Sequence, residues 1–232
     1  DYFIPVAGST QNLSAEIALP GSTVEYYKLS YDFAKYWPLS QALVLKTGVN
    51  LGYGDSYGKD FTRNLCYTAG TCVDTNDDDI LDTFVPGPDP SDPCLPTSPD
   101  FDKTVTATGL PFFENFYAGG IASQGKVRGF VDNTLGPAYT STSGYRQPLG
   151  GSFLLAGSVE AIFPKLFDSP AARDSAFLDF GNVYDGWDNF SASELRASAG
   201  IALLWRSPMG PLSISYALPL RKKDGDQIER LQ

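Results

Sequence analysis

Strict alternation of apolar and small polar residues is the feature that most constrains how this chain can fold. From Leu195 to Trp205 every second residue is Leu, Ala, Ile or Trp, and the residues between them are mainly Arg, Ser, Gly and Ala. A period of two is the repeat of a β-strand, whose side chains point to opposite faces in turn, whereas a helix repeats every 3.6 residues. This segment therefore predicts a strand with one apolar and one polar face.

The same pattern recurs and predicts seven strands. They are Asn12–Leu19, Val24–Tyr36, Ala42–Gly54, Ser152–Phe163, Ser175–Tyr184, Leu195–Trp205 and Leu212–Leu220. Strands of this length match a tilted membrane crossing of roughly 9 to 11 residues. Aromatic residues recur near the strand ends, namely Tyr36, Trp37, Tyr53, Phe163, Tyr184 and Trp205. Such rings are typical of the interfacial girdle of a membrane barrel, although edge packing in a soluble sandwich is the alternative.

The polar face and the connections favour a barrel. The polar face is built from Gly, Ser, Ala and Asn with scattered charges, as in a barrel lumen, whereas a soluble sandwich exposes many charges to water. Connections alternate between short (Pro38–Gln41, Ser207–Gly210) and long (residues 55–150, Asp185–Glu194). Seven strands cannot close alone, because hydrocarbon does not tolerate an unpaired edge. We therefore expect an all-β fold, an antiparallel transmembrane β-barrel of which this chain supplies about seven strands.

Composition excludes several functional classes. The chain has no His, which removes the commonest general base and the commonest zinc ligand. Its formal net charge is -10, so a nucleic-acid partner is not expected. Much of the acid lies between Asp55 and Lys103, where proline is also frequent. This stretch favours a solvated outer loop.

All three cysteines, Cys66, Cys72 and Cys94, fall in this acidic stretch. Clustering in a polar segment favours a disulfide between Cys66 and Cys72 in an oxidising compartment, and three reduced thiols are the alternative. Without His or a fourth Cys, zinc is not expected. Residues 74–85 have part of the spacing of a calcium loop but lack its Gly and its final Glu. We predict no metal and no cofactor.

The run Val127, Arg128, Gly129, Phe130 interrupts the strand series within a glycine-rich region. A lone arginine there is often an exposed turn residue. However, the polar faces of two later strands offer the carboxylates Glu160 and Asp179, and a guanidinium binds carboxylates through paired hydrogen bonds. The same carboxylates could also be a glycosidase pair. With the arginine available, we expect a structural ion pair and no enzyme activity.

Several motifs carry a resemblance to a known family. Residues 111–120 (Pro-Phe-Phe-Glu-Asn-Phe-Tyr-Ala-Gly-Gly) precede the Val-Arg-Gly-Phe run. With the runs at 19–22, 179–185, 198–202 and 207–211, they resemble the BamA family, the outer-membrane protein assembly factors. The resemblance covers nearly the whole chain except for roughly Ser56 to Gly109. The matching runs also follow one another in the same order along the chain as they do in the family.

The resemblance implies a 16-stranded barrel in the bacterial outer membrane, preceded by periplasmic POTRA domains, with residues 1–232 as strands nine to fifteen of the barrel. Residues 55–110 are then an extracellular insertion and residues 111–150 a loop inside the lumen. In the family this loop's arginine contacts acidic residues of the wall, which here match Arg128 with Glu160 and Asp179.

The implied function is folding and inserting β-barrel proteins into the outer membrane of Gram-negative bacteria. The implied partners are the lipid bilayer and lipopolysaccharide, unfolded outer-membrane protein clients and, through POTRA domains, the Bam lipoproteins. A related translocation pore, either a TamA-like module or a two-partner secretion exporter, is the alternative. The number of POTRA domains distinguishes these classes.

Overall fold

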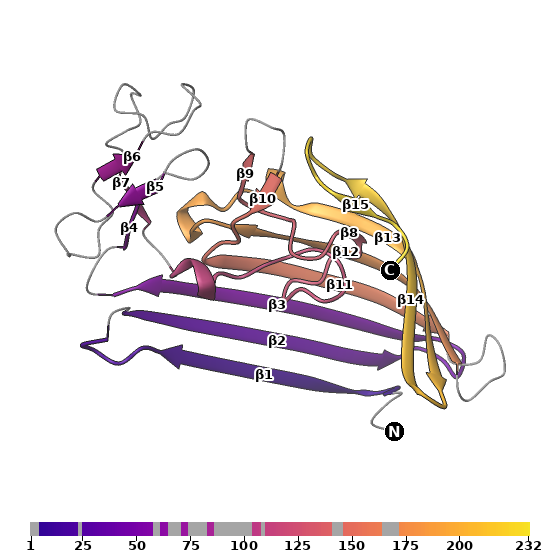
Figure 1. Ribbon diagram of the computed structural model, residues 1–232. Helices are drawn as coiled ribbons and strands as arrows, with labels where there is room; N and C mark the ends of the chain where they lie inside the picture. Colours follow the sequence, from indigo (N-terminus) through magenta and orange to yellow (C-terminus); the bar gives the residue numbers. More distant parts are fainter. Residues whose placement is uncertain are drawn as a thin grey trace.

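The computed structural model describes residues 5–22, 25–57, 61–64, 71–73, 83–85, 104–107, 110–140, 146–163 and 172–232. Seven long strands form one antiparallel sheet in the order β1-β2-β3-β11-β12-β13-β14 (Figure 1). Their bounds are β1 Gly8–Ile17, β2 Tyr26–Pro38, β3 Val44–Ser56, β11 Phe153–Phe163, β12 Ala172–Tyr184, β13 Arg196–Ser207 and β14 Gly210–Arg221. The predicted all-β antiparallel architecture is confirmed.

The register sets apolar residues side by side on one face of this sheet. Leu13 of β1 faces Tyr31 of β2, Tyr31 faces Leu51 of β3, and Leu51 faces Leu155 of β11. The neighbouring positions belong to the opposite face, where the Asn50 side chain donates a hydrogen bond of 2.7 Å to Asp32. The alternation in the sequence is therefore the alternation between an apolar and a polar face.

Three strands begin earlier than the alternation predicts: β1 by four residues, β12 by three and β14 by two. β12 starts at Ala172 rather than at Ser175. Asp174 falls on the apolar face, which hides the period-two pattern, and it pairs with Leu203 in the ladder. The preceding Arg173 is buried on the other face, with its guanidinium 5.9 Å from the centre of the Tyr36 ring. A cation that packs on an aromatic ring can occupy a position where the sequence alone suggests a turn.

Residues 110–140, hereafter the inner segment, lie against the concave side of the sheet (Figure 1). They contain η1 (Phe112–Glu114), β8 (Gly129–Phe130) and β9 (Ala138–Thr140), which pairs with β10 (Arg146–Pro148). The main core lies between the inner segment and the sheet. Its buried side chains include Phe116, Val127, Phe130 and Leu135 of the inner segment and Leu154 and Val183 of the sheet.

In the described part of the predicted 55–110 insertion there are four short strands. β4 (Phe61–Asn64) pairs with β7 (Thr104–Ala107), and β5 (Thr71–Val73) pairs with β6 (Thr83–Val85). Cys66, one member of the expected disulfide with Cys72, lies outside the described residues, as does Cys94. In the described part of the chain, no helix has the length and apolar character needed to cross a membrane.

Candidate functional site

Arg128 of the inner segment binds Asp179 of β12 through both ends of its guanidinium. Nε donates a hydrogen bond of 2.7 Å to Oδ2, and Nη2 donates one of 2.9 Å to Oδ1. The Arg128 backbone N–H donates a third, of 3.1 Å, to Oδ2. Arg128 is 3% exposed and Asp179 is 0% exposed. A bidentate, buried pair of this kind fixes the position of the inner segment relative to the wall.

Neighbouring strands complete the set of partners. Ser158 of β11 donates a hydrogen bond of 2.6 Å to Asp179 Oδ1 and accepts one of 3.4 Å from Arg128 Nη2. Phe177 lies beneath the guanidinium, with the Arg128 Cζ 3.3 Å from the ring centre. An arginine in van der Waals contact with an aromatic face is stabilised by the ring quadrupole. Residues of strands β11 and β12 together therefore form the binding site for the Arg128 guanidinium.

Glu160 of β11 is a more distant partner. Its Oε1 lies 3.6 Å from Arg128 Nη1, which is the distance of an ion pair and too long for a good hydrogen bond. Ser175 donates a hydrogen bond of 2.5 Å to the same oxygen, and Lys46 lies 3.4 Å from Oε2. The Glu160 carboxylate therefore forms ion pairs with both Arg128 and Lys46.

The inner segment adds a further cation beside this pair. Burial lowers the pKa of the Lys126 ammonium, and the neighbouring Arg128 charge lowers that pKa further. The site therefore combines three basic side chains, those of Lys46, Lys126 and Arg128, with the carboxylates of Glu160 and Asp179. Among the described residues, no cluster of three or more His, Cys, Asp or Glu side chains could hold a metal ion.

Gly129 has a conformation and a contact that favour glycine. Its φ is +91°, a region that L side chains rarely adopt. A Cβ at this position would lie 3.0 Å from the Ala217 Cβ of β14. Next to it, Phe130 is 0% exposed within the main core. The Arg-Gly-Phe order thus places a cation at β12, a close backbone approach at β14 and an aromatic ring in the core.

The end of the chain also binds the inner segment. β15 (Ile228–Glu229) pairs with β8. The Gln232 side chain accepts a hydrogen bond of 3.2 Å from the Gly129 N–H and donates one of 2.7 Å to the Phe130 carbonyl. Residues Arg230 to Gln232 hydrogen-bond to the β14 backbone. The terminal residues thus lie between β8 and the edge of the sheet.

A second anchor lies near the start of the inner segment. Lys28 of β2 donates a hydrogen bond of 2.7 Å to the Glu114 carbonyl and lies 3.2 Å from its carboxylate. The same ammonium lies 4.8 Å from the centre of the Phe116 ring. Gly52 leaves room for that ring, because a Cβ there would come within 2.5 Å of it. The inner segment is therefore held at both Glu114 and Arg128.

Sequence reasoning missed several of these partners. Ser158 and Phe177 could have been found, because they share the inward parity of Glu160 and Asp179 on the same strands. Lys28 has the polar-face parity of its strand, but nothing in the sequence pattern pairs it with Glu114. Gln232 carries no sequence signal, since its contact depends on the path of the chain after β14.

Comparison with known proteins gives this geometry a family context. The Omp85 superfamily domain matches residues 1–232. The outer membrane protein assembly factor BamA of Neisseria meningitidis serogroup B is 32% identical over 98% of the chain, and the chain covers 26% of that protein. BamA of Nitratidesulfovibrio vulgaris is 37% identical over 51% of the chain. The chain therefore spans about a quarter of the length of the Neisseria relative.

A solved structure agrees with the sequence matches. The crystal structure of BamA from Haemophilus ducreyi lacking POTRA domains 1–3 superposes with a TM-score of 0.68 at 29% identity. The match covers 99% of this chain and 38% of that chain. The seven-stranded sheet and its inner segment thus correspond to a portion of an outer-membrane barrel.

Proposed function

Because the chain belongs to the Omp85 superfamily, we propose that its full-length protein folds and inserts β-barrel proteins into the bacterial outer membrane. The observation that carries this proposal is the 32% identity to an assembly factor over 98% of the chain. The clients are unfolded outer-membrane proteins, and the surroundings are the lipid bilayer with its lipopolysaccharide. Bam lipoproteins would bind through POTRA domains.

The inner segment supports a mechanical role in this function. Arg128 joins it to β12, Lys28 joins it to β2, and Gln232 joins it to the segment that follows β14. A segment tied to both sides of a curved sheet braces the wall against collapse or shear. We assign Val127, Arg128, Gly129 and Phe130 to this brace, with Asp179 as the main acceptor and Glu160 as the secondary one.

No covalent chemistry is needed for such a role. Asp179 is saturated by Arg128 and Ser158, and Glu160 by Ser175, Lys46 and Arg128. Carboxylates held in this way do not offer the free acid and base that glycoside hydrolysis requires. An assembly factor instead supplies a strand edge and a deformed bilayer, so that client strands can pair before they leave the protein.

The direct test is reconstitution of the full-length protein in liposomes with a chemically unfolded barrel client. Assembly predicts that the client acquires its heat-resistant, compact gel mobility much faster than in empty liposomes. A translocation pore predicts that a secreted substrate is transferred into the liposome interior while barrel folding stays at the empty-liposome rate. The second result would replace our proposal with the related exporter function.

A further inference from the structure

The connection between β12 and β13 returns to the apolar face of the sheet. Trp187, in η2 (Trp187–Asn189), packs edge-to-face on Phe153 of β11 with ring centres 4.9 Å apart. The centre of the Phe190 ring lies 6.0 Å from that of Phe153 and 5.3 Å from that of Tyr184. Trp187 nevertheless remains 62% exposed and Phe190 42% exposed. These two rings therefore form a wall that stands on the outward face of the sheet.

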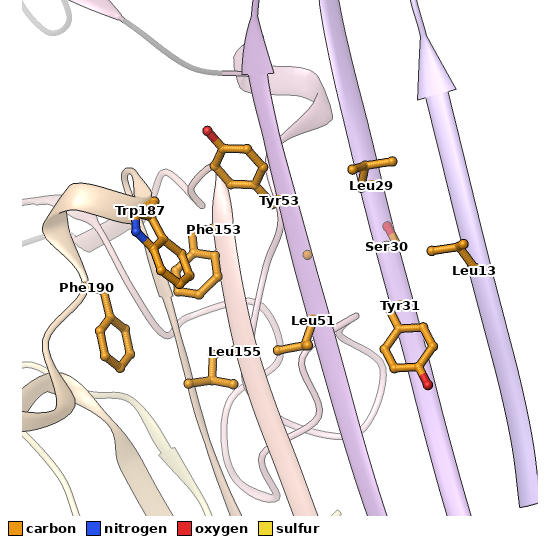
Figure 2. A pocket seen from close by; sticks show the side chains of 11 residues that line it. Leu13, Leu29, Ser30, Tyr31, Leu51, Tyr53, Phe153, Leu155, Trp187 and Phe190 are labelled. Atoms are coloured by element: carbon orange, nitrogen blue, oxygen red, sulfur yellow. The ribbon is translucent and has the colours of Figure 1, made fainter.

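This wall borders a groove on the apolar face of the sheet (Figure 2). The groove has a volume of about 750 Å³. Leu51 and Leu155 lie at its centre, and Leu13, Leu29 and Tyr31 continue the lining across β1 and β2 (Figure 2). Among the residues that the structure describes, no Asp, Glu, Lys or Arg side chain lines it. Its volume falls within the range of roughly 300–1,000 Å³ that is typical of ligand sites.

The groove belongs to the surface that faces the bilayer. Its aliphatic residues occupy the outward positions of β1, β2, β3 and β11, and Leu13, Leu29 and Leu51 are exposed in the chain. The aromatic wall comes from the connection after β12, and the long 55–110 stretch follows β3 at the same end of the sheet (Figure 1). Long connections of outer-membrane barrels lie on the extracellular side. The groove therefore opens into the outer leaflet.

The contents of such a groove follow from its chemistry. Water would find too few hydrogen-bonding partners among leucine and aromatic side chains, and an empty groove would forfeit dispersion contacts on its open side. Acyl chains are the apolar component that surrounds this surface. We propose that the groove binds one fatty acyl chain of an outer-leaflet lipid, seated on Leu51 and Leu155 beside the Trp187–Phe190 wall.

The preference of an acyl chain for the groove over the bulk bilayer must come from packing contacts. Lipid tails are as apolar as leucine, so a chain in the groove gains no hydrophobic transfer energy over a chain in the bulk bilayer. It gains contacts on two sides, from the strand face and from the aromatic wall, whereas a lipid on a flat strand face touches protein on one side. This site is independent of client assembly and rests on the membrane location alone.

Photocrosslinking of the full-length protein in nanodiscs tests the site. The probe is a phosphatidylcholine with a diazirine at the middle of one acyl chain, and crosslinked positions are mapped by mass spectrometry without any client. We expect the crosslink yield per lipid at Leu51 and Leu155 to exceed that at Ile201 and Leu218 about tenfold, which corresponds to about 1.4 kcal/mol. Ile201 and Leu218 are controls outside the groove, since both are exposed outward residues of β13 and β14.

Two variants separate the groove from general lipid contact. Leu51→Trp fills the groove and is expected to abolish the enrichment, whereas Ile201→Trp is expected to leave it unchanged. If Leu51→Trp does not reach the folded gel mobility, Trp187→Ala removes the more exposed ring of the wall and carries the same expectation. Equal yields at the groove and at the controls would overturn the proposal. It would also fail if an added unfolded client displaced the lipid and took up the crosslinks at Leu51, because the groove would then be a client site.

Discussion

At the scale of single residues, Arg128 illustrates how burial decides the value of an ion pair. Asp179 is fully buried, so its charge depends on Arg128 and on Ser158. Removing one partner of a buried pair leaves an uncompensated charge, whereas replacing both partners by apolar groups can be neutral. The pair is therefore better understood as fixing the register of the inner segment than as adding net stability.

We predict that Arg128→Ala lowers the stability of the full-length barrel by about 3–5 kcal/mol, because it leaves Asp179 buried and unpaired. Arg128→Lys keeps the charge but loses the paired geometry, so we expect an intermediate loss. The measurement is the midpoint of heat unfolding in detergent, followed by gel mobility, together with growth of a depletion strain. Lys222→Ala, which removes an exposed cation, is the control. Unchanged unfolding and growth in both Arg128 variants would contradict the brace.

Gly129 allows backbone strain and steric contact to be separated. Gly129→Ala combines a positive φ with a 3.0 Å approach to Ala217, whereas Gly210, at φ +129°, has nothing within 4 Å of an added Cβ. Gly186 has open space and an extended φ of -162°. We expect a loss of about 1–3 kcal/mol from strain at Gly210→Ala, a larger loss at Gly129→Ala and almost none at Gly186→Ala. The heat-unfolding midpoints give the order, and equal losses at Gly129 and Gly210 would show that the Ala217 contact is unimportant.

At the scale of elements, two connections at one end of the sheet are tied together by charge. Arg196, at the start of β13, binds Asp226 through two hydrogen bonds of 3.0 Å, and Asp226 has a side chain that is 0% exposed. Lys223 lies 2.7 Å from Glu194, which also contacts Arg196. These pairs join the segment before β13 to the segment that leads from β14 into β15.

The exposed member of this network gives a pH-dependent prediction. The hydrogen bond from Lys223 lowers the pKa of the Glu194 carboxyl, with the charges of Lys223 and Arg196 acting in the same direction. A lowered folded-state pKa means that the stabilisation is present above the unfolded pKa of about 4.3 and is lost as pH falls through the folded value. A double-mutant cycle of Glu194→Gln and Lys223→Gln should therefore show coupling at pH 7 that disappears in strong acid.

The size of this coupling is limited by solvent. Both side chains are more than 40% exposed, so we expect about 0.2–1 kcal/mol and a decrease with added salt. Asp226→Asn supplies a contrast, because it removes a buried charge from Arg196 and should cost more than either exposed change. A coupling that persists in acid would contradict the role of Glu194 ionisation.

The elements also show what the sequence could predict. Period-two alternation identified all seven strands of the large sheet and their faces, because burial against the core and exposure to lipid leave a periodic record in each strand. It could not predict that Trp187 and Phe190 fold back onto Phe153, or that Gln232 reaches β8. Those contacts depend on the paths of irregular segments, which carry no repeat. The contact of Arg128 with Asp179 was within reach of prediction, because Glu160 and Asp179 stood on polar faces that were already assigned and the family resemblance placed the arginine against them.

At the scale of the whole molecule, the sheet is a curved wall and the inner segment a strut across it. Contacts along the strut involve β2, β11, β12, β14 and the terminal residues. In the function proposed above, such a strut would hold the shape of a wide barrel while client strands pair at a seam elsewhere. It also means that the anchors near Glu114 and at Arg128 act on the same object.

This shared action predicts that the two anchors are not additive. Lys28→Met removes the contact with Glu114, and Arg128→Ala removes the contact with Asp179. Mutations at independent sites usually add within about 0.3–0.5 kcal/mol. If the segment is held as one unit, releasing either anchor already frees much of it. The double variant should then lose clearly less stability than the sum of the two single losses.

The measurements are heat unfolding and protease cleavage within residues 110–140 of the full-length protein, with client folding in liposomes as the functional readout. We expect each single variant to expose the inner segment to protease and to slow client folding, and the double variant to add little to either effect. Lys28→Met combined with Glu194→Gln is the additive control, since Glu194 lies in the other network. Full additivity of Lys28→Met and Arg128→Ala would mean that the two ends are held separately, and that the segment fills the lumen without bracing the wall.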